Sequence, residues 1–265
     1  MPELIHKTAI IHPKAKLDAT VRVGPFAVID EDVELGANCV VGPHVYLTGQ
    51  TKIGANNSFH AGCVIGDAPQ DLKYKNEPTR LRIGNGNVFR EHVTIHRSTI
   101  LDGETIIGAN NFFMANSHVA HNCVIGDHVI LVNGALLGGH AMVQDRAFIS
   151  GICGVHQFCR VGTLAMMQGG SVVTKDLPPY CVALRTNEMC GLNVVGLRRA
   201  NVSAQERMEL KRLYHLLFRG GKNLRDALAE AQKNFTGASA KILLEFVAGA
   251  KRGVCADVSH EIEND

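Results

Sequence analysis

Histidines are the residues of this 265-residue chain that could most readily do chemistry, since it contains 13 of them. Seven fall between residues 92 and 156, namely His92, His96, His118, His121, His128, His140 and His156. An imidazole has an unperturbed pKa near 6.5, which suits a general base, and it is also a common zinc ligand. The cluster therefore indicates acid–base catalysis or a metal site, while a histidine that stands alone is more often structural.

A six-residue repeat must position these side chains. Steps of six from Ile5 to Val173 meet apolar residues at 27 of 29 positions, and the two exceptions are Asp71 and Glu77. A glycine often follows the apolar residue, and glycine accepts the backbone conformations that recurring turns demand. The chain has 27 glycines and no tryptophan, as a narrow, regular interior requires. A period of six is typical of parallel β-helices.

The pattern resembles the hexapeptide-repeat acyltransferases, which implies a left-handed parallel β-helix of triangular coils. The fold class expected is thus mainly β, with the β-helix followed by a small C-terminal α-helical domain. Three hexads form a coil, so residues 18 apart stack at about 4.8 Å. On this count His121, His140 and His156 share one face, and His121 stacks with Gly139 and then Gln157. His96 counts to a different face, from which it could join the others only across an interface between subunits.

Composition marks two further segments. A polar loop, residues 66–82, interrupts the repeat, and the repeat itself ends near Tyr180, so we expect domains at 1–180 and 181–265. In the second domain, helices are predicted from a capping box at Ser203–Glu206 to Gly220, from Leu224 to Lys233, and from Ser239 to Gly253. Residues 196–256 hold 12 Lys and Arg against five Asp and Glu, which indicates an acidic partner or a phosphorylated ligand.

Several classes are excluded or disfavoured. A net charge of +2 argues against a nucleic-acid binder, and no apolar run approaches the roughly 18 residues of a membrane span. No secretory signal is recognisable, so a cytoplasmic location is expected. Five of the eight cysteines share the small inward position of the repeat, which predicts core packing: Cys39, Cys63, Cys123, Cys153 and Cys159. No Cys-x-x-Cys pair suggests a thiolate metal site.

An ordered set of motifs narrows the resemblance. It comprises Gln70–Tyr74, Thr94–Arg97, His118–His121, Gly138–His140, Val155–Phe158 and Leu192–Arg199. In this order they closely resemble the acyl-carrier-protein–UDP-N-acetylglucosamine O-acyltransferase family, whose members catalyse the first step of lipid A synthesis. The resemblance implies transfer of an (R)-3-hydroxyacyl group from acyl-carrier protein to the 3-hydroxyl of UDP-N-acetylglucosamine. It further implies a homotrimer with interfacial sites, and no cofactor or metal.

The resemblance also assigns roles. His121 would be the general base, and the backbone N–H of Gly139 would stabilise the oxyanion. Sugar contacts would come from Asp71, Lys73, His140 and Gln157, with His118 supporting the site and His156 contacting acyl chain or sugar. The nucleotide or its diphosphate would meet His96, Asn193, Arg198 and Arg199, and the acyl chain would be measured by Met166, Gln168 and Gly169.

Two positions depart from the family pattern. Asn122 follows the base where some relatives carry an acid, so no carboxylate can orient His121 from there. Val195 stands where a relative may place a glutamate against the nucleotide. Neither acyl-chain length nor the choice between ester and amide product follows from the sequence.

Two alternatives remain open. A zinc hydratase of the γ-carbonic anhydrase type uses the same fold and three histidines across an interface. A non-catalytic β-helix scaffold would need no histidine cluster at all.

Overall fold

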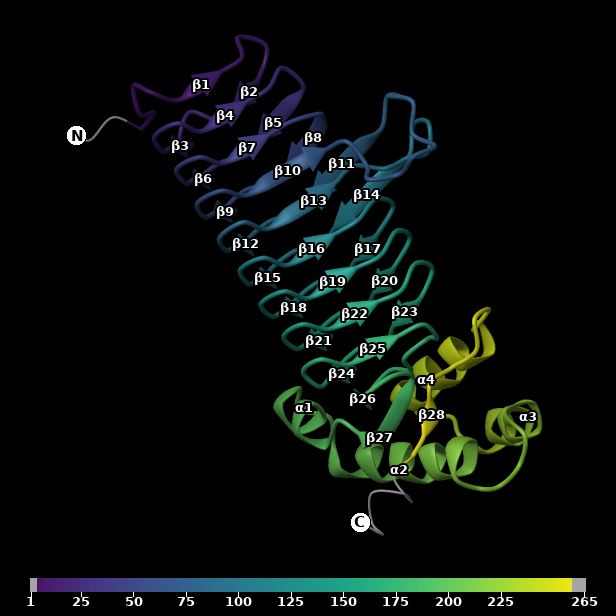
Figure 1. The fold of residues 1–265 in the computed structure, drawn as a ribbon. Helices are drawn as coiled ribbons and strands as arrows, with labels where there is room; N and C mark the ends of the chain where they lie inside the picture. Colours follow the sequence, from purple (N-terminus) through teal and green to yellow (C-terminus); the bar gives the residue numbers. More distant parts are fainter. Residues whose placement is uncertain (1–3, 259–265) are drawn as a thin grey trace.

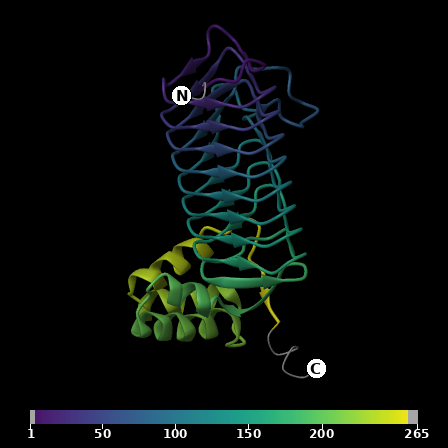
Figure 2. The same cartoon turned by 90° about the vertical axis from the view of Figure 1, so that its left-hand side faces the viewer.

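The computed structural model describes residues 4–258, which form a left-handed parallel β-helix closed at one end by helices (Figure 1). The predicted fold class is therefore confirmed. Each coil has three sides, and successive coils pair along three parallel sheets, here called A, B and C. Figure 2 shows the stacked strands from the side, with the helices gathered at the C-terminal end of the stack.

Within residues 4–258, the strands group as follows. Sheet A contains β3 (Arg22–Val23), β6 (Val40–Val41), β9 (Ser58–Phe59), β12 (Val88–Phe89), β15 (Phe112–Phe113), β18 (Ile130–Leu131), β21 (Phe148–Ile149), β24 (Met166–Met167), β26 (Cys181–Leu184), β27 (Glu188–Leu192) and β28 (Ala256–Asp257). Sheet B contains β1 (Ile10–Ile11), β4 (Val28–Ile29), β7 (Tyr46–Leu47), β10 (Val64–Asp67), β13 (Thr94–His96), β16 (His118–Val119), β19 (Leu136–Leu137), β22 (Gly154–Val155) and β25 (Val172–Val173). Sheet C contains β2 (Lys16–Leu17), β5 (Val33–Leu35), β8 (Gln50–Ile53), β11 (Arg80–Ile83), β14 (Glu104–Ile107), β17 (Val124–Ile125), β20 (Met142–Val143) and β23 (Arg160–Val161).

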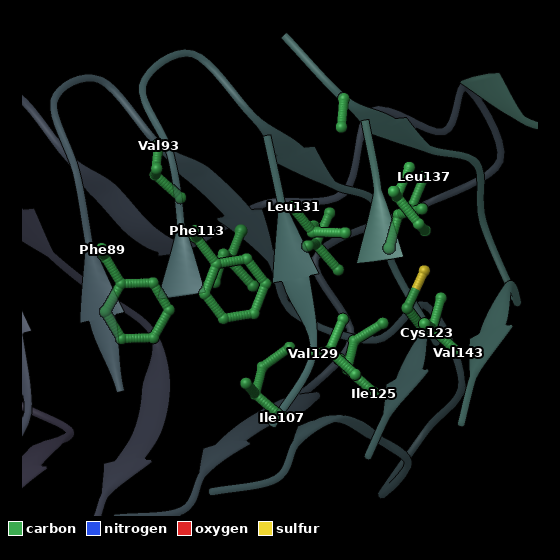
Figure 3. Close-up of a cluster of buried hydrophobic side chains, with 14 of the residues drawn as sticks. Phe89, Val93, Ile107, Phe113, Cys123, Ile125, Val129, Leu131, Leu137 and Val143 are labelled. Atoms are coloured by element: carbon green, nitrogen blue, oxygen red, sulfur yellow. The ribbon is translucent and has the colours of Figure 1, made fainter. Parts of the chain in front are cut away.

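The hexad residues fill the interior. Phe89, Phe113 and Leu131, from neighbouring strands of sheet A, and Leu137, from β19 of sheet B, point inward and are completely buried (Figure 3). The five cysteines at the small inward position are also buried, which confirms their prediction as core residues. Inward side chains of one coil touch those of the next, so the core is a continuous column rather than a single centre.

Two insertions lengthen individual coils at the corner between sheets B and C. Ile65 pairs with Ile95, a step of 30 residues in place of 18, because residues between β10 and β11 form the predicted polar loop. Ile95 pairs with Val119, a step of 24, because six more residues are inserted between β13 and β14. The sequence did not reveal this second insertion, since Leu101 keeps the period of six although it is 60% exposed. The assignment of Leu101 to the repeat is therefore wrong.

Buried asparagines hold the register across these longer coils. Asn57, Asn87 and Asn111 lie one above another inside the helix, and each is at most 1% exposed. The Oδ1 of Asn57 accepts from the backbone N–H of Asn87 at 2.8 Å, and the Oδ1 of Asn87 accepts from that of Asn111 at 2.9 Å. This asparagine ladder links coils of 30, 24 and 18 residues, so it aligns strands exactly where coil length changes. Phe59, Phe89 and Phe113 stack beside it.

Four helices lie in the described C-terminal residues: α1 (Val194–Arg199), α2 (Ala204–Phe218), α3 (Leu224–Asn234) and α4 (Ala238–Ala248). The capping box that begins α2 is present as predicted, and α3 begins where expected. The third predicted helix, α4, ends at Gly249 and not at Gly253. Helix α1 and the strands β26–β28 were not predicted. These strands extend sheet A beyond residue 180, and the division into domains there stays a prediction.

Arg160 links helix α4 to the β-helix. Arg160, at the end of sheet C, contacts the carboxylate of Asp176 at 2.7 Å and also donates to the carbonyl of Phe246 in α4 at 2.8 Å. Its guanidinium lies 4.2 Å from the centre of the Phe246 ring.

Among residues 4–258, no helix is both long and apolar enough to cross a membrane.

Replacing Asn87 with alanine should destabilise the fold by about 2–4 kcal/mol, because buried backbone groups of neighbouring coils would lose their partners. Denaturant unfolding followed by circular dichroism measures this free energy. Asn133→Ala, at an exposed position, is the control and should change it by less than about 0.5 kcal/mol. Equal stabilities of the two variants would contradict the role of the asparagine ladder.

Candidate active site

A cluster of histidines lies on sheet B and at the corner that leads from it to sheet C. The rings of His96 and His118 are 5.0 Å apart, and those of His121 and His140 are 5.5 Å apart. His96 is on β13 and His118 is on β16, which are neighbouring strands of one sheet. The prediction that His96 lies on another face is therefore wrong. The six inserted residues between β13 and β14 equal one side of the triangular coil. Counting in steps of 18 residues therefore placed His96 one side away from its actual sheet.

The predicted stacking of His121, Gly139 and Gln157 is confirmed at this corner. The backbone N–H of His140 donates to the carbonyl of His121, and that of Phe158 donates to the carbonyl of Gly139. Residues Asn122, His140 and Phe158 occupy equivalent corner positions with φ between +61° and +64°. The ring of His140 stacks on Phe158 at 4.5 Å. His156 and Gln157 follow β22 and are exposed, so the patch opens to solvent there.

His121 is held from one side by its neighbour in sequence. Its Nδ1 lies 2.7 Å from Oδ1 of Asn122, which leaves Nε2 available on the opposite side of the ring. The amide of Asn122 is itself bonded to Ser98 and Thr99, which belong to the second insertion. An amide thus orients His121 although the carboxylate of some relatives is missing. Sequence reasoning found the departure at position 122 but missed Ser98 and Thr99.

Gly139 has no side chain, and this leaves room for the imidazole of His121. A Cβ at position 139 would lie 2.5 Å from Cε1 and 2.8 Å from Nε2 of His121, which is closer than carbon atoms approach in proteins. The ring therefore lies directly against the glycine backbone. In the described part of the chain, the N–H of Gly139 has no hydrogen-bond partner. A proton acceptor and an unpaired backbone donor thus sit within one small volume, as transfer of an acyl group requires.

Burial keeps the surrounding imidazoles neutral. It lowers the pKa of His118 to about 4, with His96 and His121 adding to the effect. Burial also lowers the pKa of His96, although the charge of Asp67 opposes this, and lowers that of His140. The Nδ1 of His118 lies 2.7 Å from Oγ1 of Thr94. The Nδ1 of His96 is buried without a hydrogen-bond partner in the described residues.

The first insertion reaches the same site from the same chain. The carboxylate of Asp71 is near enough to His140 to act on its pKa in the raising direction. Asp71 also accepts from the backbone N–H of Lys73 at 2.9 Å, which forms a tight turn, and the Lys73 side chain is exposed. Arg97 fixes this loop, since it donates to the carbonyl of Gly66 at 2.9 Å and to the Tyr74 hydroxyl at 3.2 Å.

A second group of predicted residues lies apart, on sheet A. A cavity of about 970 Å³ is lined by Met166, Gln168, Asn193, Val195 and Arg199, among others. Arg198 is beside it on α1 and Gly169 follows Gln168 after β24, both exposed. Within one chain these residues do not meet the histidine cluster. His96, which was predicted to act with Asn193, lies with His118 and His121 instead.

Asn193 also has a structural task that the sequence did not reveal. It is the N-cap of α1: its Oδ1 accepts from the N–H of Gly196 at 2.9 Å, and its Nδ2 donates to the carbonyl of Leu164 at 2.9 Å. An asparagine before a helical turn is a recognised start signal, and it could have predicted α1. The cap thus lies where the first residues of α1, Val194 and Val195, line the cavity.

Comparison with known proteins identifies the family. A model described as UDP N-acetylglucosamine O-acyltransferase, domain 2, matches residues 176–255. The bacterial transferase hexapeptide model matches residues 8–49, 32–67 and 104–139. Acyl-[acyl-carrier-protein]–UDP-N-acetylglucosamine O-acyltransferases from Thiobacillus denitrificans and Thermodesulfovibrio yellowstonii are 47% and 45% identical, and cover 94% and 95% of the chain and 98% of their own lengths. The chain belongs to this O-acyltransferase family.

Solved structures agree with the assignment. LpxA from Acinetobacter baumannii is 36% identical, with a TM-score of 0.92 over 95% of this chain and 99% of its own. The UDP-N-acetylglucosamine acyltransferase of Francisella novicida is 32% identical, with a TM-score of 0.91 over 98% and 96%. In this family member, residues 4–258 hold no group of three or more His, Cys, Asp or Glu arranged to bind a metal ion.

Gly139→Ala should lower kcat for acyl transfer by at least about 100-fold, because the new Cβ would push the His121 ring out of position. The φ of Gly139 is one that alanine adopts, so the variant should fold normally. Gly154→Ala, whose Cβ would meet Val172 at an ordinary 3.6 Å, is the matched control. Steady-state kinetics of both variants test this, and unimpaired turnover by Gly139→Ala would contradict it.

Stability should depend on pH through His118. Between pH 6.5 and about 4 the unfolded chain binds a proton at this residue, whereas the folded chain does not. The free energy of unfolding should therefore fall as the pH falls through this window, by up to about 1.4 kcal/mol per pH unit for one proton.

Unfolding curves at pH 7.5, 6 and 5 measure this dependence. His118→Gln should flatten it, while His44→Gln, at an exposed position of another corner, should leave it unchanged. An identical slope for wild type and His118→Gln would show that His118 does not contribute.

Proposed function

We propose that the chain transfers an (R)-3-hydroxyacyl group from acyl-carrier protein to the 3-hydroxyl of UDP-N-acetylglucosamine, the first step of lipid A biosynthesis. The observation that carries the proposal is the pairing of His121 with Gly139: the imidazole lies directly against the backbone of Gly139, whose N–H has no hydrogen-bond partner in the described residues. Relatives that share nearly the whole chain are named acyl-[acyl-carrier-protein]–UDP-N-acetylglucosamine O-acyltransferases, which supports the donor and the acceptor proposed here.

Each step of the reaction has a group to perform it. Nε2 of His121 takes the proton of the sugar 3-hydroxyl as its oxygen attacks the thioester carbonyl. The N–H of Gly139 donates to the oxyanion of the tetrahedral intermediate, which buried, fixed donors stabilise well. When the intermediate collapses, the C–S bond breaks, and the imidazolium returns the proton to the departing thiolate of the carrier protein. The products are the 3-O-acyl sugar nucleotide and the free carrier thiol.

The sugar would lie along the corner between sheets B and C. Asp71 and Lys73 would contact it from the first insertion, and His140 and Gln157 from the coils that follow His121. His118 would support the site from β16, and the exposed His156 would meet sugar or acyl chain. Since His96 lies beside His118, we assign it to the sugar side of the ligand.

The nucleotide and acyl chain would use the cavity on sheet A. Guanidinium groups such as those of Arg198 and Arg199 suit a diphosphate, and Asn193 holds the helix that carries them. Met166, Gln168 and Gly169 would set the acyl length, and the exposed Gly169 has no side chain to block the groove, which supports a longer chain. Val195, which also lines the cavity, offers no polar side chain to the nucleotide.

We propose that a second subunit unites the two regions. The histidine cluster and the cavity lie on different sides of one chain, so a copy that places its sheet A against the B–C corner would complete the site. This supports a homotrimer, in which three such interfaces close a ring. No cofactor is needed for the reaction. We further expect the protein to work in the cytoplasm, where its eight free cysteines would stay reduced.

His121→Gln tests the assignment of the base. We expect it to lower kcat by on the order of 10²- to 10⁴-fold, the contribution typical of general base catalysis. Wild-type and variant enzymes are mixed with UDP-N-acetylglucosamine and 3-hydroxyacyl-carrier proteins of several chain lengths, and the product is measured by mass spectrometry. His44→Gln serves as the control and should keep the wild-type rate.

Two outcomes would contradict the proposal. Transfer by His121→Gln at the wild-type rate would show that another group is the base. A wild-type protein that transfers no acyl chain in the panel would favour the alternative of a non-catalytic scaffold. Product hydrolysis in mild alkali, which cleaves an ester far faster than an amide, identifies the bond formed.

A further inference from the structure

We propose that Ser98 and Thr99 are positioning residues for the reaction: they fix the amide of Asn122 in one orientation, and this orientation sets the tautomer of His121 that can act as a base. The proposal rests on the role of His121 in the proposed function. Both residues lie in the second insertion, between β13 and β14, which the hexapeptide period concealed.

The oxygen side of the amide is fixed by Thr99. The Oδ1 of Asn122 accepts from the backbone N–H of Thr99 at 3.1 Å and from its Oγ1 hydroxyl at 2.8 Å. A peptide N–H can only donate, so the amide atom that faces it must be the oxygen. The orientation of this side chain therefore follows from a main-chain group whose role cannot reverse.

The nitrogen side is fixed by Ser98. The Nδ2 of Asn122 donates to Oγ of Ser98 at 2.6 Å, and the same oxygen accepts from the backbone N–H of Ile100 at 3.0 Å. Ser98 is completely buried, so water does not compete for these bonds. A flipped amide would place its NH₂ group against the N–H of Thr99, donor against donor, and would be strongly disfavoured.

The orientation of Asn122 decides where His121 carries its proton. Oδ1 can only accept, so the Nδ1 that lies 2.7 Å away must bear the hydrogen. In a neutral imidazole the other nitrogen is then bare, and this is the Nε2 that lies against Gly139. With the amide reversed, Nδ2 of Asn122 would donate to Nδ1 of His121. Nε2 of His121 would then carry the ring proton and could not accept a proton from the substrate.

The difference between an amide and a carboxylate at position 122 explains why Ser98 and Thr99 are needed. A carboxylate offers an acceptor oxygen in either orientation, whereas an asparagine offers a donor in one of the two. A chain with asparagine at position 122 needs additional groups to select the correct one. Ser98 and Thr99 supply them from one coil away, and the backbone of Asn122 is anchored separately by a bond from its N–H to Oγ1 of Thr105 at 2.8 Å.

The test compares Ser98→Ala/Thr99→Val with the conservative variant Thr99→Ser, each with Asn122 and with Asn122→Asp. With Asn122, the double variant should lower kcat on the order of tenfold, since two of the three hydrogen bonds that hold the amide are lost and only the N–H of Thr99 still opposes its reversal, while KM changes little. Thr99→Ser keeps the hydroxyl and should retain nearly the wild-type kcat. In the Asn122→Asp background, the double variant should cost little or nothing further.

The tautomer is read independently of activity. Protein labelled with ¹⁵N-histidine reports by NMR which ring nitrogen is protonated, and the His121 signals are assigned by their loss in His121→Gln. We expect Nδ1–H in the wild type and in Thr99→Ser, and a rise of the Nε2–H form in the double variant. Because this readout needs no turnover, it decides the proposal even if the wild type proves inactive, which would refute only the proposed function.

Two results would overturn the proposal. An unchanged tautomer in Ser98→Ala/Thr99→Val would show that the side chains of these residues do not hold the amide in the required orientation. A loss of kcat that is equally large with Asn122→Asp, accompanied by a lower unfolding temperature, would show that they act only on the fold.

Discussion

The structure depends on one constraint: each coil must present its apolar residues to the interior in register with the coils on either side. Parallel pairing along three sheets satisfies the backbone, and the inward side chains then stack in columns of like residues. Strands of only two or three residues would be unstable in isolation. Here each is one step of a ladder, so stability is shared between neighbours, as in other repeat proteins.

The site exploits the same regularity. Residues 18 apart meet, so a histidine, a glycine and a glutamine separated in sequence become neighbours at one corner. The rigid coils fix the backbone, and the corners are where length can change without disturbing the core. Both insertions leave the β-helix at the corner between sheets B and C, and both reach the histidine cluster. The candidate catalytic residues are thus concentrated where the repeat permits additional residues.

Much of this could be predicted from the sequence because the period is a direct consequence of coil geometry. The fold class, the inward cysteines, the stacking of His121 with Gly139, and helices α2 and α3 all follow from local patterns. The position of His96 did not, because Leu101 imitates a hexad residue while lying on the surface. Helix α1 has only six residues, although Asn193 signals its start. The bonds of Asn122, in contrast, join residues from different coils. Such features depend on coil length and on side-chain direction, which a period does not encode.

The C-terminal end of the β-helix has a consequence for solubility. A stack of parallel strands ends in a row of unpaired backbone groups, on which another chain could add as a further coil. In sheet A the strand direction reverses at β27, which pairs antiparallel with β26, and helices cover this end (Figure 1). A reversed strand and a helical cover cannot template the next parallel coil, so this end resists the edge-to-edge growth that leads to fibrous aggregates.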